Sequence, residues 1–498
     1  MPLWLLVLVQ VVVSAASLVV EIVAGRMLAP YVGMSLYTWT AIIAVVLAGF
    51  SAGHWWGGRI AGRGDALART GWILLAAALT TAAAVVLLQR IAAPVIELVD
   101  HPVWAIVALC SAVFFLPSLF AGVPAPVLAR LAVDRDPDPG RALGALFAAG
   151  ALGAIAGTLL AGFLFISWLG SALTLAVVTI TYLATAVLCL VAARALRWPA
   201  ALATVAAIGA AGWSLAAPSP CDLESDYFCI RSFDVSADPA RPVQLMVLDH
   251  LVHGMSAGHD PQLFLTPHAA LLDGLSQIRA DDPGYSSFII GGGTFTMPRA
   301  IAARGGGPVT VAEIDPAVTE IAARDFWFDP ASARVLHEDA RYALTTRPDL
   351  YDVIVGDAFT DIAVPQHMIT REFYALVRDR LEPDGSYLMN VIDFEDRLQV
   401  LGAVVRSLQE VFPVVEIWTV AEQPLPGQRM VFVVVAGDRP TPIPGFATRA
   451  PQPISFAALA DEMVDQITAG SDLILTDDYA PIDRLIGFDS EPGAAAVR

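Results

Sequence analysis

Residues 286–315 read SSFIIGGGTFTMPRAIAARGGGPVTVAEID, and their pattern predicts the fold class of the C-terminal half. Two short apolar runs, 286–290 and 308–312, have the length of buried strands, and the segment 295–304 between them is predicted to be a helix. A strand, a helix and a second strand in this order predict a βαβ unit with parallel strands. Ligands of such sheets bind outside the carboxyl ends of the strands, so the residues after each strand carry the functional information.

The same alternation continues toward the C-terminus. It predicts strands at 334–337, 351–356, 385–392, 414–420 and 429–436, and helices at 316–326, 370–381 and 396–411. A small β region is expected at 222–265, and the proline-rich stretch 438–453 is expected to be a loop. The prediction is therefore an α/β Rossmann-like domain at residues 285–498, with the small β region of the same domain at 218–284.

The N-terminal half has a different composition. Seven stretches are apolar and long enough to cross a bilayer, which takes about 20 residues. They are 3–25, 37–57, 71–89, 103–129, 142–166, 171–193 and 198–217. Residues 1–217 are therefore predicted to form a polytopic transmembrane helical domain, with the lipid bilayer as its partner.

Arginines lie in alternate connections between these stretches: Arg59, Arg63 and Arg69, then Arg130, Arg135 and Arg141, then Arg194 and Arg197. The positive-inside rule places these connections in the cytoplasm, and seven crossings then put the soluble half outside. If the alanine-rich stretch 198–217 does not cross, the soluble half returns to the cytoplasm. Cys221 and Cys229 favour the outside only if they are joined, because disulfides persist in oxidising compartments. The sequence therefore leaves open whether the soluble half lies in the cytoplasm or outside it.

The soluble half is strongly acidic. Residues 1–217 hold 7 of the 48 acidic residues and 10 of the 29 basic ones, which leaves 41 acids against 19 arginines in residues 218–498. A domain this acidic binds nucleic acid poorly, so no nucleic-acid partner is expected. It would attract cations, including polyamines, although simple solubility explains the charge equally well. The cysteines show no CxxC spacing, and no metal site is expected.

Acidic residues follow successive strands of the predicted sheet. The first strand ends in Gly291–Gly293, Glu313 follows the second, Asp339 the third, and Asp357 and Asp361 the fourth. An acid after the second strand can accept hydrogen bonds from ribose hydroxyls, so with the glycines it indicates a nucleoside site. Taken singly, each acid is more commonly a helix N-cap. Acids after successive strands are hard to explain by capping alone.

Together these motifs resemble the spermidine synthases, which are aminopropyltransferases with a methyltransferase-like Rossmann fold. The resemblance rests on GGG at 291–293, VTVAEID at 309–315, EDA at 338–340 and YDVIVGDA at 351–358. The segments EIVAGRMLAPYVG at 21–33 and LTDDYAPID at 475–483 are similar to those of a membrane-fused subfamily. The resemblance thus covers nearly the full length.

The resemblance implies a role for each matching residue. Decarboxylated S-adenosylmethionine, the donor, would contact Gly291, Gly292, Gly293 and Thr294, with Glu313 at its ribose and Asp339 and Ala340 at its adenine. Asp357 would be the catalytic acid–base residue. The acceptor side would consist of Asp249, His253, His268, Asp361 and Tyr479. The implied reaction is aminopropyl transfer to a diamine such as putrescine, by a multi-pass protein of the inner cell membrane that forms a homodimer.

Three departures from the family pattern keep alternatives open. Thr294 stands where soluble members have an aspartate, and His250 and His253 replace the glycine and glutamine of L-D-G-x-x-Q. An aspartate at 294 would repel the carboxylate of intact S-adenosylmethionine, so its absence leaves methyl transfer from that donor as an alternative. A third alternative is a non-catalytic sensor or transporter that binds a nucleoside or a polyamine.

Overall fold

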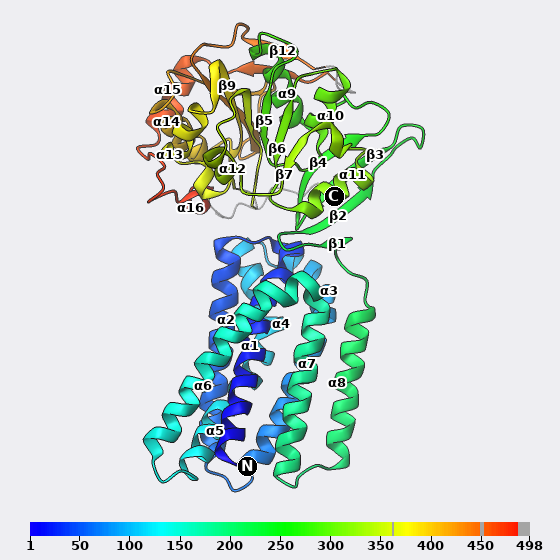
Figure 1. The fold of residues 1–498 in the computed structure, drawn as a ribbon, viewed down its shortest axis with the longest axis vertical. Helices are drawn as coiled ribbons and strands as arrows, with labels where there is room; N and C mark the ends of the chain where they lie inside the picture. The colour runs from blue at the N-terminus through cyan, green and yellow to red at the C-terminus, as the bar shows by residue number, and fades with distance from the viewer. Residues whose placement is uncertain (361–362, 449–452, 487–498) are drawn as a thin grey trace. The chain divides into compact units, whose positions relative to one another are not determined.

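The computed structural model describes residues 1–360, 363–448 and 453–486, and the chain divides into two compact units, Met1–Cys229 and Ile230–Arg498 (Figure 1). The division falls later than the predicted boundary at residue 217. Residues 218–229 belong to the first unit because their polar groups bond to its helices, as the contacts below describe.

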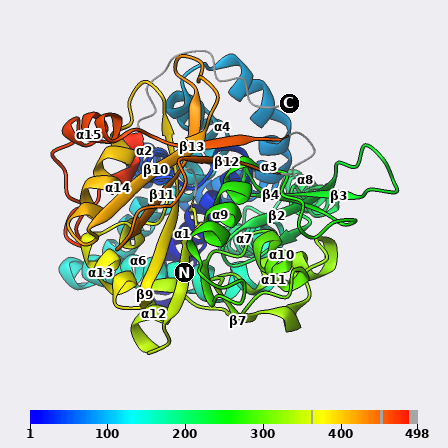
Figure 2. The same ribbon diagram turned by 90° about the horizontal axis from the view of Figure 1, so that it is seen from above.

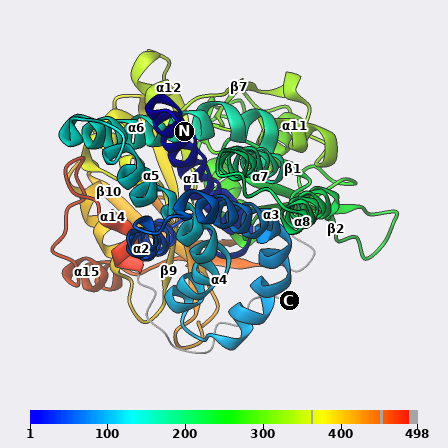
Figure 3. The ribbon, with the colours of Figure 1, turned by 90° about the horizontal axis from the view of Figure 1, so that it is seen from below.

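The first unit is helical, and α1 lies in the middle of the bundle while α8 lies at its edge (Figure 3). Its elements are α1 (Leu3–Val32), α2 (Leu36–Ala61), α3 (Ala66–Leu98), α4 (Pro102–Gly122), α5 (Pro124–Val133), α6 (Pro139–Leu160), the π-helical turn η1 (Ala161–Phe165), α7 (Ile166–Ala192) and α8 (Trp198–Ala216). Glycines of α6 allow close contact with α1. A Cβ atom at Gly157 would lie 2.2 Å from the backbone oxygen of Ala15.

Within the described residues, six helical segments of this unit are long and apolar enough to cross a membrane, by length and composition alone. The fifth runs from Pro139 to Ala192 and has 54 residues, far more than the roughly 20 of one crossing. Gly170 interrupts it, with φ 69° and ψ 178°. The segment therefore contains two helices, and dividing it at Gly170 accounts for the seven stretches that the sequence predicts.

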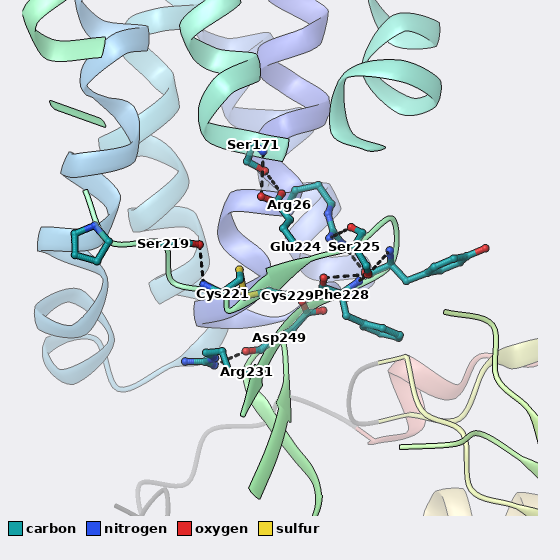
Figure 4. The surroundings of a disulfide bond; sticks show 12 residues. Arg26, Ser171, Ser219, Cys221, Glu224, Ser225, Phe228, Cys229, Arg231 and Asp249 are labelled. Atoms are coloured by element: carbon teal, nitrogen blue, oxygen red, sulfur yellow. Dashed lines mark hydrogen bonds between the residues drawn. A yellow bond between two sulfur atoms is a disulfide. The ribbon is translucent and has the colours of Figure 1, made fainter. Parts of the chain in front are cut away.

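Polar contacts bring several helix ends together around residues 218–229 (Figure 4). They join Arg26 of α1 to the carbonyls of Ser225 and Tyr227, Gln89 of α3 to the carbonyl of Pro218, and Ser171 of α7 to the carboxylate of Glu224. Cys221 and Cys229 form a disulfide in the same segment. The two free cysteines, Cys110 and Cys189, are buried in α4 and α7. The end of α1, the end of α3 and the start of α7 thus lie at one end of the bundle.

The second unit contains a mixed sheet of nine described strands in the order β12-β13-β10-β11-β9-β8-β5-β6-β7. The strands are β5 (Ser287–Ile290), β6 (Val309–Ala312), β7 (Arg334–Leu336), β8 (Tyr351–Gly356), β9 (Leu381–Phe394), β10 (Val414–Val420), β11 (Arg429–Gly437), β12 (Gly445–Ala447) and β13 (Ser455–Ala458). β9, β8, β5, β6 and β7 are parallel, whereas β11 pairs antiparallel with β9. Every strand predicted between 286 and 436 is present.

The loop prediction for 438–453 was wrong in part, because β12 lies within it. The side chain of Phe446 explains the strand. Its ring centroid lies 5.9 Å from that of Trp418 in β10 and 5.5 Å from that of Phe456 in β13. This aromatic packing holds the segment against the edge of the sheet, where β12 pairs antiparallel with β13.

Helices cover both faces of the sheet, with α13 and α14 on one face and α9 and α10 on the other (Figure 2). The helices are α9 (Pro267–Arg279), α10 (Thr296–Ala303), α11 (Pro316–Asp325), α12 (Ala340–Thr346), α13 (Arg371–Arg378), α14 (Gln399–Gln409), α15 (Asp461–Ala469) and α16 (Ile482–Ile486), with 3₁₀ turns η2 (Pro330–Ser332) and η3 (Gln366–Met368). The predicted helices are confirmed as α10, α11, α13 and α14. The remaining helices were not predicted from the sequence.

The predicted small β region is confirmed as a meander before the sheet. Its strands are β1 (Leu223–Glu224), β2 (Cys229–Asp234), β3 (Val243–Leu248) and β4 (Leu251–Ala257), and β3 pairs antiparallel with β2 and β4. β4 packs on the loop after β5, since a Cβ atom at Gly254 would lie 2.7 Å from Oγ1 of Thr294. The β region therefore borders the edge of the sheet where a ligand is expected.

Candidate active site

The glycine loop after β5 has a backbone that only glycine adopts easily. Gly291 and Gly293 have φ values of 90° and 49°, in the left-handed region. A Cβ atom at Gly291 would lie 2.6 Å from the backbone oxygen of Asp357. The loop after β5 and the loop after β8 therefore touch, and they bring the predicted nucleoside site next to the predicted catalytic residue.

Glu313 follows β6 and anchors this loop. Its side chain is buried, and its two carboxylate oxygens accept hydrogen bonds from the backbone N–H of Gly292 (2.7 Å) and of Asp315 (2.9 Å). Burial raises the pKa of Glu313 to about 7, against the opposing effect of these N–H donors. A carboxylate has about four lone-pair sites, so capacity remains for the hydroxyls of a ribose.

Asp339 is an N-cap, as the common role of such acids suggests. Its side chain accepts a hydrogen bond from the N–H of Tyr342 at the start of α12 (2.9 Å) and lies 2.8 Å from Nε2 of His367. The hydrogen bond with His367 is the largest cause that lowers the pKa of Asp339. Ala340 next to it is buried. The predicted adenine contact of these two residues stays a prediction.

Thr294 lies inside a network of hydroxyl groups. Its Oγ1 atom lies 2.7 Å from Oγ1 of Thr296, which lies 2.6 Å from Oγ of Ser256 in β4. Thr294 is buried against Gly254. The residue therefore joins the glycine loop to the β region, in addition to the donor contact that the resemblance implies.

Asp357 follows β8, and its carboxylate is held by a residue that the sequence analysis missed. Nδ2 of Asn390, in β9, donates a hydrogen bond of 2.8 Å to Oδ1 of Asp357. The available signal was an isolated amide inside the apolar run 387–392 of β9, YLMNVI. Asp361, predicted on the acceptor side, lies outside the described residues.

One histidine of the β region, His253, interacts with Asp357. His253 in β4 interacts electrostatically with Asp357 and with His268, and its Nδ1 lies 3.0 Å from the carbonyl oxygen of Leu251. Burial lowers the pKa of His253, and it lowers the pKa of His250 to about 4. His250 and His253 are therefore uncharged at neutral pH and do not repel a cationic amine.

The structure places the last two predicted acceptor residues in different surroundings. Asp249 is buried between β3 and β4 with a φ of 53°, and its backbone oxygen accepts a hydrogen bond from Arg231 (Figure 4). Tyr479 is 50% exposed, and its hydroxyl accepts a hydrogen bond from Arg484 (3.0 Å). Neither contact tests binding of an amine. Among the described residues, no group of three His, Cys, Asp or Glu side chains is arranged to hold a metal.

Comparison with known proteins finds similarity in the C-terminal part of the chain. Residues 280–442 match the family model of the spermine/spermidine synthase domain. A probable polyamine aminopropyl transferase of Bifidobacterium longum is 35% identical over 111 residues, which are 22% of this chain and 25% of that protein. An N-terminal histidine N-methyltransferase of Emericella nidulans is 30% identical over 160 residues, 31% of this chain and 28% of that protein. The chain thus spans about a quarter of the length of these two relatives.

Among solved structures, a probable spermidine synthase from Corynebacterium glutamicum superposes with a TM-score of 0.44 and 19% identity, covering 50% of this chain and 94% of that one. The glycine loop, Glu313 and Asp357 all lie within the residues that the family model matches. By the match of residues 280–442 to that family model, the C-terminal part of this chain contains a spermine/spermidine synthase domain.

Proposed function

We propose that the soluble unit transfers an aminopropyl group from decarboxylated S-adenosylmethionine to a diamine such as putrescine. The observation that carries this proposal is the contact between the glycine loop at Gly291 and the backbone of Asp357. It supports a site in which a nucleoside on the loop lies next to a carboxylate. The family model and the aminopropyl transferase relative favour the same reaction.

In this reaction, a nitrogen of the diamine attacks the methylene carbon of the aminopropyl group that is bonded to the donor's sulfonium sulfur. The new N–C bond forms as the C–S bond breaks, and the electron pair of that bond stays on sulfur to give methylthioadenosine. A primary amine is protonated at neutral pH, so it must lose a proton to become nucleophilic. Asp357 would accept a proton from the amine and orient its nitrogen toward the donor.

The surroundings of Asp357 suit a cationic acceptor. The imidazole of His253, which interacts electrostatically with Asp357, carries no charge at neutral pH because burial lowers its pKa. The soluble half as a whole is acidic, with 41 acids against 19 arginines after residue 217. Both features favour a polyamine or another small cationic amine over an anionic acceptor.

Mass spectrometry of products tests the reaction directly. We expect the purified protein, given putrescine and decarboxylated S-adenosylmethionine, to form spermidine and methylthioadenosine. With intact S-adenosylmethionine and the same amine, an N-methylated product would identify a methyltransferase instead. If neither donor is consumed, the proposal of a catalytic domain is wrong, and the non-catalytic alternative gains support.

Methyl transfer is the second candidate function, and Thr294 favours it. Where a carboxylate would repel the carboxylate of the intact donor, this chain has a hydroxyl that bonds to Thr296. The N-methyltransferase relative is a further observation in its favour. The donor experiment above separates the two reactions.

We further propose a multi-pass protein of the inner cell membrane, with the soluble unit on the side opposite the cytoplasm. Seven crossings, counted with the break at Gly170, place residues 218–229 across the bilayer from the N-terminus. The disulfide between Cys221 and Cys229 favours an oxidising compartment at that end. The arginine-bearing connections α2–α3, α5–α6 and α7–α8 lie an odd number of crossings away, as the positive-inside rule requires. Both substrates must then reach the outer face.

The homodimer that the resemblance implies is also a proposal. It is tested by the molar mass of the purified protein in light scattering, after subtraction of the bound detergent. A mass equal to that of one chain, 52.7 kDa, would reject it.

A further inference from the structure

β9 is a mostly apolar strand in the middle of the sheet, and it carries one amide side chain. Asn390 is 3% exposed, and it is the only asparagine in the 498 residues of the sequence. The chain also lacks lysine, whose codons are adenine-rich like those of asparagine. A shortage of adenine-rich codons explains why asparagine is rare in this chain. Its presence at one buried position points to a requirement for the amide group there.

The amide group of Asn390 is held rigidly beside Asp357. β8 and β9 are parallel neighbours in which Gly356 is opposite Met389, and β11 pairs with the other edge of β9. Nδ2 of Asn390 donates to Oδ1 of Asp357 at 2.8 Å. An ionised carboxylate only accepts hydrogen bonds, so the amide nitrogen must face Asp357 and the amide oxygen must point elsewhere.

The amide oxygen of Asn390 is buried and has no hydrogen-bond partner within the described part of the chain. A buried acceptor without a donor is costly, and nearly all such groups in folded proteins are satisfied. The ionised carboxylate of Asp357 has no proton to donate. A ligand that brings an N–H group to Asp357 would supply the missing donor.

We propose that Asn390 positions both reacting partners of Asp357. Its N–H group fixes the carboxylate, and its oxygen accepts an N–H of the acceptor amine. The amine nitrogen then donates hydrogen bonds to two oxygens, one of Asp357 and one of Asn390. Once a proton has passed to Asp357, these contacts direct the nitrogen lone pair toward the donor. The amide oxygen is far less basic than the carboxylate, so it does not compete for that proton. This inference rests on the proposed function, because an amine is the ligand that supplies the N–H.

Two variants separate the two contacts of Asn390. Asn390→Leu keeps the approximate volume and removes both polar atoms, whereas Asn390→Asp keeps an oxygen acceptor and removes the N–H donor. Thr419→Val is the matched control. It also removes a side-chain hydrogen bond of a buried residue, from Oγ1 of Thr419 to the backbone oxygen of Val431 (2.9 Å), but Thr419 lies in β10, two strands from β9. The full-length protein in detergent, saturated with methylthioadenosine, is titrated with putrescine by calorimetry, and turnover is measured in parallel.

We expect Asn390→Leu to bind putrescine at least about tenfold more weakly, the size of a lost hydrogen bond to a charged group, with unchanged affinity for methylthioadenosine. Asn390→Asp should retain putrescine binding while kcat falls about tenfold or more, because the carboxylate of Asp357 is no longer held. Thr419→Val should change neither quantity. This split between binding and turnover is not expected from a residue that only stabilises the fold.

Unchanged putrescine affinity and turnover in both Asn390 variants would overturn the inference while leaving the proposed function intact. Equal losses of methylthioadenosine and putrescine affinity in Asn390→Leu would also overturn it, since they indicate a general structural role. If Asn390→Leu does not fold, the nearly isosteric Asn390→Asp decides through its kcat. A native protein that neither binds nor modifies putrescine would reject the proposed function and this inference together.

Discussion

Glu313 gives the site a pH dependence that follows from its burial. Its pKa is raised to about 7, so the side chain is largely neutral at pH 6 and largely ionised at pH 8. The ionised form accepts hydrogen bonds from ribose hydroxyls more strongly, so affinity for methylthioadenosine should increase as the pH rises through 7. Calorimetry of the native protein and of Glu313→Gln at both pH values tests this.

The glutamine variant is the control for that titration. It should bind methylthioadenosine more weakly than the native protein at pH 8, by about 1–3 kcal/mol, and its affinity should not vary with pH. A native protein with the same affinity at pH 6 and pH 8 would show that the carboxylate of Glu313 does not contact the ligand.

The side chain at position 294 is expected to influence which donor the protein binds. An aspartate there would attract the ammonium of the decarboxylated donor and repel the carboxylate of the intact one. Two unit charges about 4 Å apart interact by about 4 kcal/mol at an effective dielectric constant near 20. We therefore expect the native protein to bind both donors with comparable affinity and Thr294→Asp to prefer the decarboxylated one.

The burial of Thr294 complicates that substitution, so a control is needed. Thr294→Val removes the hydroxyl that bonds to Thr296 without adding charge. If the valine and aspartate variants change the affinities of both donors alike, the effect comes from the disturbed loop. A native protein that already rejects the intact donor would rule out Thr294 as the determinant of donor choice.

The site residues that directly follow strands could be predicted from the sequence, whereas the residues that form hydrogen bonds with them could not. Gly291, Glu313 and Asp357 follow short apolar runs, so their positions at one sheet edge follow from the βαβ pattern. Asn390 was missed because an isolated amide within a strand has no sequence neighbours that reveal its contact with Asp357. The pairing of Asp339 with His367 is likewise a tertiary contact across 28 residues.

Among the elements, seven strands of the large sheet were predictable because each contains a short run of apolar residues, as in β5 and β6, which are buried throughout. The short helix α12 and the strand β12 were not, because local composition says little about them. β12 forms where the ring of Phe446 packs on Trp418 and Phe456, which are distant in sequence. The break between the stretches 142–166 and 171–193 was also predictable, and the structure places it at Gly170, whose positive φ interrupts the helical backbone inside α7.

The contact between α1 and α6 yields a prediction at this scale. A side chain at Gly157 would meet the backbone oxygen of Ala15, and backbone cannot move aside as a flexible side chain does. Gly157→Leu should therefore destabilise the first unit by about 1–3 kcal/mol, the usual cost of overpacking. Gly144→Leu is the matched control on the same helix, because a Cβ atom at Gly144 would meet nothing within 4 Å. Thermal unfolding in detergent compares the two, and equal melting temperatures would contradict this account of the packing.

At the scale of the whole molecule, the sequence left the side of the soluble unit open, because the parity of crossings depends on the stretch 198–217. That stretch is helix α8, and it bonds to α3 through Ser214 and the carbonyl of Ala82 (2.6 Å). The disulfide at its far end was also undetermined, since two cysteines eight residues apart do not reveal their compartment.

Thiol labelling in intact cells measures the orientation. After mild reduction, a membrane-impermeant maleimide should label the half-buried Cys221 from outside, whereas Cys110, Cys189 and Cys229 are buried and should stay unlabelled. Arg63→Cys, in the α2–α3 connection, should react only after the cells are opened. Labelling of Arg63→Cys in intact cells, with protection of Cys221, would reverse the orientation.

The stoichiometry of turnover tests whether Asp357 activates an amine for aminopropyl transfer. Purified full-length protein is given putrescine and decarboxylated S-adenosylmethionine, and both products are quantified over time for the native chain and for Asp357→Asn. The native protein should form spermidine and methylthioadenosine in a one-to-one ratio. The variant should still bind methylthioadenosine but turn over about 10²–10⁴ times more slowly. Near-normal turnover in Asp357→Asn, or methylthioadenosine released without an aminopropylated amine, would contradict the account.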